Sequence, residues 1–196
     1  MTIRPMTEPH SSSNTRIPGE AGIWAFVTGD LLVFSVFFVL IAVGQAQQPE
    51  VFAASRARLD LWVGVVNTLL LLTGSWFVAM GVERCRTDGA RNDGRDFALA
   101  ILCGLGFVAN KLFEWGHRIR DGLSPLTDDF YTYFFIFTGI HLLHVLVGLT
   151  VLCFLRAVSR RSALTRADLR TLESGAIFWH LVDLLWVMLF ALLYLL

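Results

Sequence analysis

Charged residues are scarce in this sequence, and neither sign is in excess. Only 16% of the 196 residues are charged, whereas an average soluble domain carries about 25%. Lys and Arg together number 16, as do Asp and Glu, so the formal net charge is zero. A nucleic-acid-binding protein needs a basic surface. The composition therefore argues against an ordinary soluble domain and against a nucleic-acid partner.

Cysteine patterns, catalytic motifs and a secretory signal are also lacking. Cys85, Cys103 and Cys153 fit neither a disulfide framework nor a thiolate metal motif. The sequence has no nucleophile–base pair or phosphate loop, so we expect no catalytic centre in this chain. Residues 1–18 are polar and lack the apolar core of a signal peptide. They predict a disordered or surface-lying leader.

Hydrophobic residues make up 55% of the chain and gather into five long blocks without proline. A helix that crosses about 30 Å of hydrocarbon needs about 20 mostly apolar residues. None of the blocks alternates in polarity, as the strands of a membrane barrel do. The sequence therefore predicts an all-α integral membrane bundle of five transmembrane helices over residues 19–196. The predicted spans are Gly22–Val43, Leu61–Val82, Phe97–Trp115, Phe130–Leu155 and Ala176–Leu196.

The arginines between the spans predict the orientation, because cytoplasmic loops carry an excess of basic residues. Eleven arginines lie on the side of the amino terminus and four on the other side. We therefore expect the amino terminus inside and the carboxyl terminus outside. The eleven are Arg4, Arg16, Arg84, Arg86, Arg91, Arg95, Arg156, Arg160, Arg161, Arg166 and Arg170, and the four are Arg56, Arg58, Arg118 and Arg120.

Polar side chains interrupt the apolar blocks, and an ionisable one costs about 2.5–3.5 kcal/mol near the bilayer centre. Each of them must therefore face protein, water or a partner. Asp30 stands alone in the first span, beside the apolar segment Leu31–Phe34. The other members of the candidate intramembrane polar network are Asn67, Thr68, Asn110, Glu114, Thr138, His141, His144, His180 and Asp183.

Helical spacing and depth predict that these residues form two layers. At 1.5 Å per residue, Asp30, His144 and Asp183 lie roughly 10–16 Å from the inner ends of their helices, with His180 shallower. This inner layer is expected to join spans one, four and five. An outer layer is expected to join spans two and three through Asn67, Asn110 and Glu114.

The second span also carries a seam of small residues, which membrane helices use to approach one another closely. The seam comprises Gly64, Asn67, Leu71, Gly74 or Ser75, Val78 and Gly81. Structural interpretations apply to several polar residues as well. Hydrogen bonds between helices would account for Asn67, Thr68, Asn110 and Thr138. Lys111 would pair with Glu114 on one helix face and extend toward the headgroups.

The histidines raise the question of haem or metal ligation. His144 and His180 differ in depth by roughly 10 Å, which disfavours joint ligation of a haem. We therefore expect no metal or haem in this chain, and neutral, hydrogen-bonded imidazoles packed against Asp30 or Asp183. Asp30 itself is compatible with two roles, as a structural hydrogen-bonding group or as a proton carrier.

Four segments resemble subunit III of the haem-copper oxidases, the cytochrome c oxidase subunit III family. The first span reads GIWAFVTGDLLVF and the second contains NTLLLLTGS. The fourth reads TGIHLLHVLVG, and the fifth contains ESGAIFWHLVDLLW. In these motifs Asp30 stands in the place of the family's buried acid, and Glu114 in that of a further glutamate.

The resemblance implies an accessory membrane subunit that has no redox cofactor of its own. Such a subunit packs on the catalytic subunit I, which holds the haem and copper, in a complex that includes subunit II. The implied location is the bacterial plasma membrane. The implied function is support of the respiratory chain, in which electron transport to oxygen is coupled to proton translocation. Structural phospholipid and a proton-antenna role for Asp30 are also implied.

Two departures leave the core complex open. Mitochondrial members have seven helices, and the first two are absent here. Asp30 replaces the usual Glu, as in quinol oxidase subunit III and in the subunit III-like protein of nitric oxide reductase. The electron donor and the lipid species therefore stay open. An independent proton channel or transporter is a more distant alternative, because no inverted repeat or broken helix is visible.

Overall fold

The computed structural model describes residues 20–87 and 93–196, and the described chain is helical. Five of its helices are long and apolar enough to cross a membrane, which confirms the predicted all-α bundle of five spans. The predicted leader over residues 1–18, and Arg91 of the orientation prediction, lie outside the described residues. The elements are α1 (Ala21–Gln47), α2 (Pro49–Arg56), α3 (Leu61–Thr87), α4 (Arg95–Arg120), α5 (Asp129–Ser159), α6 (Arg166–Phe190) and the π-helical turn η2 (Ala191–Leu195).

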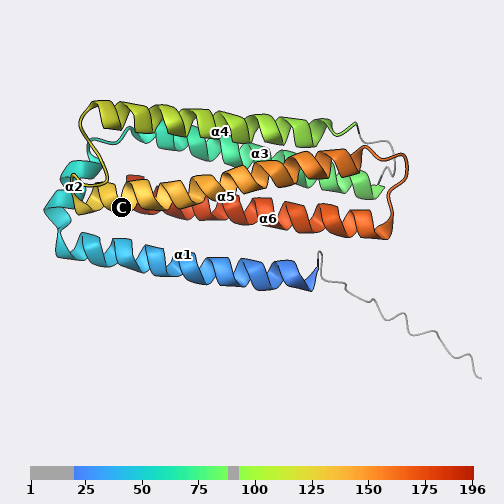
Figure 1. The fold of residues 1–196 in the computed structure, drawn as a ribbon, viewed down its shortest axis with the longest axis horizontal. Helices are drawn as coiled ribbons and strands as arrows, with labels where there is room; N and C mark the ends of the chain where they lie inside the picture. Colours follow the sequence, from blue (N-terminus) through green and yellow to red (C-terminus); the bar gives the residue numbers. More distant parts are fainter. Residues whose placement is uncertain (1–19, 88–92) are drawn as a thin grey trace, which may run out of the picture.

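Helices α3, α4, α5 and α6 form a four-helix bundle, and α1 lies along its edge against α5 and α6 (Figure 1). Few side chains of α1 are buried, chiefly Phe34 and Ile41. The helix α2, the α4–α5 connection and the last residues of the chain lie together at one end, which we call the α2 end. The opposite end, where α1 begins, we call the loop end.

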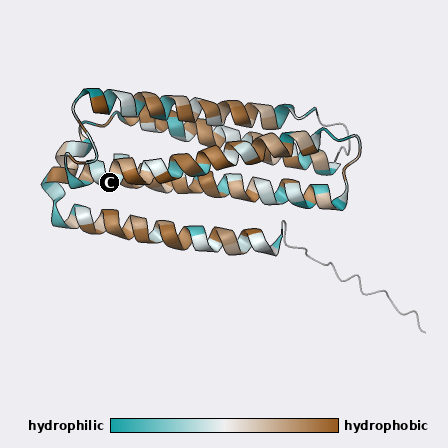
Figure 2. Ribbon diagram, viewed as in Figure 1, coloured by the Kyte–Doolittle hydropathy of each residue, from teal (hydrophilic) through white to brown (hydrophobic). Residues whose placement is uncertain are grey.

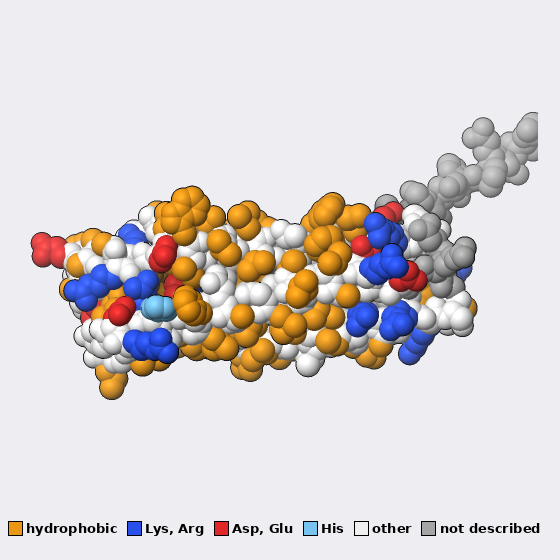
Figure 3. All heavy atoms as spheres, turned by 90° about the horizontal axis from the view of Figure 1, so that it is seen from above, with side chains coloured by type: hydrophobic (Ala, Val, Ile, Leu, Met, Phe, Trp, Pro, Cys, Tyr) orange, Lys and Arg blue, Asp and Glu red, His pale blue; other side chains and the backbone are white. Residues whose placement is uncertain are grey.

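The surface has an apolar belt between two charged ends. Hydrophobic residues cover the middle of the long helices, and hydrophilic ones gather at their ends (Figure 2). The space-filling view shows the same separation, with the charged side chains near both ends (Figure 3). Many large apolar side chains are exposed in the belt, among them Leu32, Val36 and Leu102. This distribution fits a multi-pass membrane protein, because lipid tails rather than water solvate the belt.

The predicted seam of small residues on α3 is buried as expected. A Cβ atom at Gly74 would lie 3.3 Å from the Cβ atom of Cys103 on α4, and one at Gly81 would lie 3.0 Å from the Phe97 ring. Gly148 on α5 similarly leaves room for the indole of Trp179 on α6, which would lie 2.9 Å from a Cβ atom at this position. Glycine at these positions allows the helices to pack closely.

Two helical segments lie outside the apolar blocks. The short helix α2 follows α1, and we did not predict it because eight residues are too few to span a membrane. Helix α6 begins at Arg166, well before the apolar block at Ala176. Its start is stabilised by a capping box, in which Thr165 and Asp168 each accept a hydrogen bond from the other's backbone N–H.

Candidate functional site

Asp30 of α1 and His144 of α5 meet where α1 packs on the edge of the bundle. The Nε2 atom of His144 lies 3.2 Å from Oδ1 of Asp30, and the two side chains are only 19% and 11% exposed. The ring of Phe34 contacts the imidazole edge-on, with 5.6 Å between the ring centroids. This contact confirms the expectation that a histidine packs against Asp30, and it joins spans one and four of the predicted inner layer.

The two ring nitrogens of His144 have different partners. Its Nδ1 atom lies 2.9 Å from the carbonyl oxygen of Ile140. A carbonyl oxygen only accepts, so Nδ1 carries a proton. With Nδ1 engaged by its own helix, Nε2 is the ring nitrogen that faces the carboxylate. The contact therefore joins a base on α5 to an acid on α1.

His180 and Asp183 of α6 do not join Asp30, so this part of the predicted inner layer was wrong. His180 Nδ1 lies 2.6 Å from the hydroxyl oxygen of Ser75 on α3. Asp183 is buried, and its Oδ1 atom has no hydrogen-bond partner among the described residues. Apolar runs do not determine how a helix is rotated, and the rotation of α6 turns His180 toward α3 instead of α1.

His141 also differs from its prediction. It is fully buried on α5, but neither ring nitrogen has a hydrogen-bond partner within residues 20–87 and 93–196. The imidazole lies between aromatic rings, with its centroid 5.7 Å from that of Phe107 and 5.4 Å from that of Trp186. It is thus surrounded by aromatic side chains rather than packed against a carboxylate.

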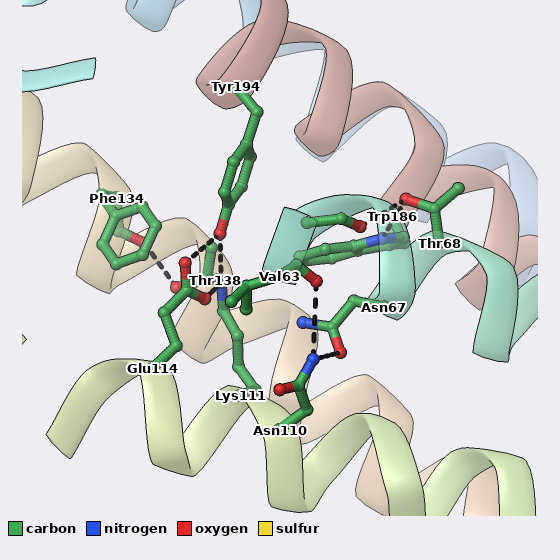
Figure 4. Close-up of polar contacts among 11 residues, drawn as sticks. Val63, Asn67, Thr68, Asn110, Lys111, Glu114, Phe134, Thr138, Trp186 and Tyr194 are labelled. Atoms are coloured by element: carbon green, nitrogen blue, oxygen red, sulfur yellow. Dashed lines mark hydrogen bonds and ion pairs between the residues drawn. The ribbon is translucent and has the colours of Figure 1, made fainter. Parts of the chain in front are cut away.

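Lys111, Glu114 and Tyr194 form a closed hydrogen-bonded triad nearer the α2 end (Figure 4). The ammonium of Lys111 donates to Oε2 of Glu114 at 2.8 Å and to the Tyr194 oxygen at 3.0 Å. The Tyr194 hydroxyl donates to Oε1 of Glu114 at 2.6 Å. The triad joins α4 to the last turn of the chain.

The predicted pairing of Lys111 with Glu114 is thus confirmed, but Lys111 does not extend toward the headgroups. Its side chain is 0% exposed. Its ammonium lies 4.6 Å from the centroid of the Phe134 ring and 5.0 Å from that of Trp186. Aromatic faces attract a desolvated cation, so the interior of the bundle stabilises this charge better than an extended conformation would.

The predicted contact between spans two and three is confirmed by an amide pair, also seen in Figure 4. Asn110 of α4 donates to Oδ1 of Asn67 on α3 at 2.9 Å. Thr68 accepts a hydrogen bond from the indole of Trp186 at 3.0 Å, which connects α3 to α6. Thr138 instead donates to the carbonyl of Phe134 in its own helix, so it does not connect helices.

Sequence reasoning missed three polar partners: Ser75, Trp186 and Tyr194. Ser75 was assigned only to the small-residue seam, and the other two were given no place in the polar network. A usable signal existed for Tyr194, because it lies near the outer end of the last span, where Lys111 and Glu114 also lie. A buried ion pair needs further hydrogen bonds, and a phenol at matching depth supplies them.

An open groove lies at the edge of the bundle. A groove of about 390 Å³ lies between α1, α5 and α6 and has mainly apolar walls, including Phe26, Val151 and Phe178. Within residues 20–87 and 93–196, no three His, Cys, Asp or Glu side chains are grouped so that they could hold a metal ion. The Asp30–His144 pair brings an acid and a base into contact.

Comparison with known proteins gives a consistent result over almost the whole chain. A family model described as "Cytochrome c oxidase subunit III" matches residues 19–196. The chain is 29% identical to "Probable cytochrome c oxidase subunit 3" of Nocardia farcinica and 30% identical to that of Mycobacterium leprae, over 89% of this chain and 86% of each relative. It is 24% identical to "Probable quinol oxidase subunit 3" of Staphylococcus aureus, over 89% and 87%.

Proposed function

This chain belongs to the cytochrome c oxidase subunit III family and is an accessory subunit of a haem-copper oxidase, and we propose that it supports proton uptake by its catalytic partner. The partners would be subunit I, which carries the haem and copper, and subunit II. The complex would reside in a bacterial plasma membrane, with the amino terminus of this chain inside. Oxygen chemistry would take place in subunit I.

The Asp30–His144 pair is the observation that carries this proposal. It places an acid and a base 3.2 Å apart. Both groups lie at the edge of the bundle, because α1 packs on the outside of the four helices α3–α6. An acid–base pair of this kind can take up and release a proton without creating two separated charges in a low-dielectric region. Asp30 would therefore act as a proton antenna rather than only as a hydrogen-bonding group between helices.

Asp30→Asn in the complete oxidase tests the role of the acid. Asparagine keeps the size of the side chain but cannot exchange this proton. We expect normal initial turnover, slower proton uptake, and a severalfold faster loss of activity during turnover at high pH, where protons are scarce. Ser35→Ala is the matched control on α1, because among the described residues the Ser35 hydroxyl donates to the Leu31 carbonyl of its own helix alone. If Asp30→Asn behaves as Ser35→Ala does at every pH, Asp30 is structural.

We also propose a class of electron donor for the complex. The two relatives named as cytochrome c oxidase subunits are more similar to this chain than the quinol oxidase relative is. We therefore favour a cytochrome c oxidase, with a quinol oxidase as the second candidate. Purification of the tagged chain from its native membrane should bring down haem-containing subunits. Turnover with reduced cytochrome c, compared with turnover with a quinol, then decides between the two.

The groove between α1, α5 and α6 is proposed to hold an acyl chain of a structural phospholipid. Its walls are mainly apolar, and its volume of about 390 Å³ is open along the side of the bundle. A polar contact closes one end of it, where the backbone N–H of Glu20 donates to the hydroxyl of Ser174 at 3.1 Å. A lipid tail would complete the contact between α1 and the bundle, which is weaker than the contacts among α3–α6.

A further inference from the structure

Arg56, the last residue of α2, has unused hydrogen-bonding capacity. Its Nε and Nη2 atoms are buried and have no hydrogen-bond partner in the described part of the chain. Burial lowers the pKa of its guanidinium from the ordinary value, because desolvation disfavours the charged form. An arginine nevertheless stays protonated in proteins. The α2 end of the bundle therefore holds a positive charge whose donors are only partly satisfied.

The backbone around Arg56 is held firmly in place. The hydroxyl of the preceding residue, Ser55, donates to Oδ2 of Asp128 at 2.7 Å. The Tyr131 hydroxyl donates to the carbonyl of Ser55 at 3.4 Å, and the ring of Phe52 is buried beneath α2. These contacts fix α2 against the start of α5. The position of the Arg56 backbone is thus set by the fold before any ligand arrives.

A pocket of about 340 Å³ opens beside this guanidinium. Its lining consists of Ala53, Arg56, Ala57, Leu59, Leu61 and Tyr194. The Tyr194 hydroxyl is already engaged by Lys111 and Glu114. The polar side chain available to a ligand in this pocket is therefore Arg56, and the other walls are apolar.

Two charged residues follow Arg56 within four positions of the chain, Arg58 and Asp60. Asp60, the nearest acid along the chain, is exposed, and its Oδ1 atom accepts from the backbone N–H of Trp62 at 2.9 Å. Arg58 is exposed and does not line the pocket. Trp62 is 76% exposed at the start of α3, where an indole is typical of the boundary between headgroups and acyl chains. The pocket thus lies at the depth of lipid headgroups.

We propose that the Arg56 pocket binds a phosphate group, and that its natural source is the headgroup of a phospholipid in the leaflet at the α2 end. The planar guanidinium matches the oxygens of a phosphate with two parallel donors. The apolar walls formed by Leu59 and Leu61 suit the glycerol backbone and the start of an acyl chain. Free inorganic phosphate offers the same oxygens without the apolar part. The proposal does not depend on the proton-antenna role of Asp30.

The test measures thermal unfolding of this chain within the purified, detergent-solubilised oxidase. Three probes are titrated separately: dihexanoylphosphatidylglycerol, inorganic phosphate, and dihexanoylglycerol, which lacks the phosphate. A ligand that binds the folded state raises the unfolding midpoint, and the concentration dependence gives its apparent Kd. Arg56→Gln removes the charge, Arg56→Lys keeps it without the fork, and Arg58→Gln is the matched control. An unchanged haem content and elution volume show that each variant is assembled.

We expect dihexanoylphosphatidylglycerol to bind wild type and Arg58→Gln with equal affinity. Its affinity for Arg56→Gln should be lower by about tenfold or more, and its affinity for Arg56→Lys should be intermediate. An equal response to inorganic phosphate supports the phosphate site but assigns a soluble ligand to it. Three results overturn the proposal. These are an equal response to dihexanoylglycerol, unchanged binding in Arg56→Gln, and equal losses in Arg56→Gln and Arg58→Gln.

Discussion

The buried triad of Lys111, Glu114 and Tyr194 allows a quantitative prediction for stability. Glu114→Leu fills a similar volume but leaves the Lys111 ammonium with one hydrogen-bond acceptor, the Tyr194 oxygen. Removing one partner of a buried ion pair costs about 3–5 kcal/mol, since the remaining charge is uncompensated. The aromatic rings of Phe134 and Trp186, 4.6 and 5.0 Å from the ammonium, should keep the loss near the lower end of this range.

Removing both charges should recover much of this loss. In Lys111→Met/Glu114→Leu no charge remains buried, but the Tyr194 hydroxyl loses both of its partners. An unsatisfied buried hydroxyl costs about 1–3 kcal/mol, so the double variant should be less stable than wild type by about this amount. Adding Tyr194→Phe removes the hydroxyl as well. The triple variant should then lie within about 1 kcal/mol of wild type, because apolar side chains often replace a buried ion pair without loss.

The free energy of unfolding is measurable by titrating the full chain in dodecyl maltoside with sodium dodecyl sulfate while following tryptophan fluorescence. The decisive feature is the order of stabilities, with the single variant lowest, the double higher and the triple highest. A single variant that loses less than about 1 kcal/mol, or losses that simply add from single to triple, would refute the reasoning. Either result would mean that the triad is solvated and does not act as one unit.

Two further predictions concern packing and the attachment of α2. In Gly104→Ala the new methyl would lie 2.7 Å from Leu149 Cδ2 and 2.9 Å from the Trp179 ring, so unfolding should become easier by about 1–3 kcal/mol. Gly116→Ala is the control on the same helix, because its new methyl would meet nothing within 4 Å, and it should be neutral or stabilising by up to about 1 kcal/mol. Equal changes in the free energy of unfolding for Gly104→Ala and Gly116→Ala would contradict this prediction. Asp128→Ala removes the acceptor of the Tyr131 N–H and of the Ser55 hydroxyl, with an expected loss of about 0.5–2 kcal/mol and faster proteolysis at α2. The exposed Asp121→Ala is its control, and equal cleavage of the two variants would show that α2 is held by other contacts.

The spans were predictable because apolar length is a one-dimensional property that the bilayer thickness determines. The buried face of α3 was also predictable, because small residues at helical spacing mark close approach. The Asn67–Asn110 bond followed from matching depth on consecutive helices, which neighbour each other in space. These features depend on local spacing and on sequence order alone.

The partners of α6 were not predictable in the same way. His180 was expected to pack against Asp30 or Asp183, but it contacts Ser75 on α3. In the bundle, α6 packs against α1, α3 and α5 together, so depth alone leaves three candidate neighbours for each polar side chain. Which neighbour is chosen depends on the rotation of the helix. Large side chains such as Trp179 and Trp186 determine that rotation by where they fit, and the sequence gives no direct measure of this.

The separation of Asp30 from His144 along the chain has a consequence for biosynthesis. The two residues are 114 positions apart, so α1 enters the translocon long before the ribosome has made α5. At about 5–20 residues per second, this interval is on the order of ten seconds. During that time the nascent acid has no imidazole beside it, at a cost of about 2.5–3.5 kcal/mol in the lipid. The apolar length of α1 can bear this cost, and docking of the fourth span then gives the acid its partner.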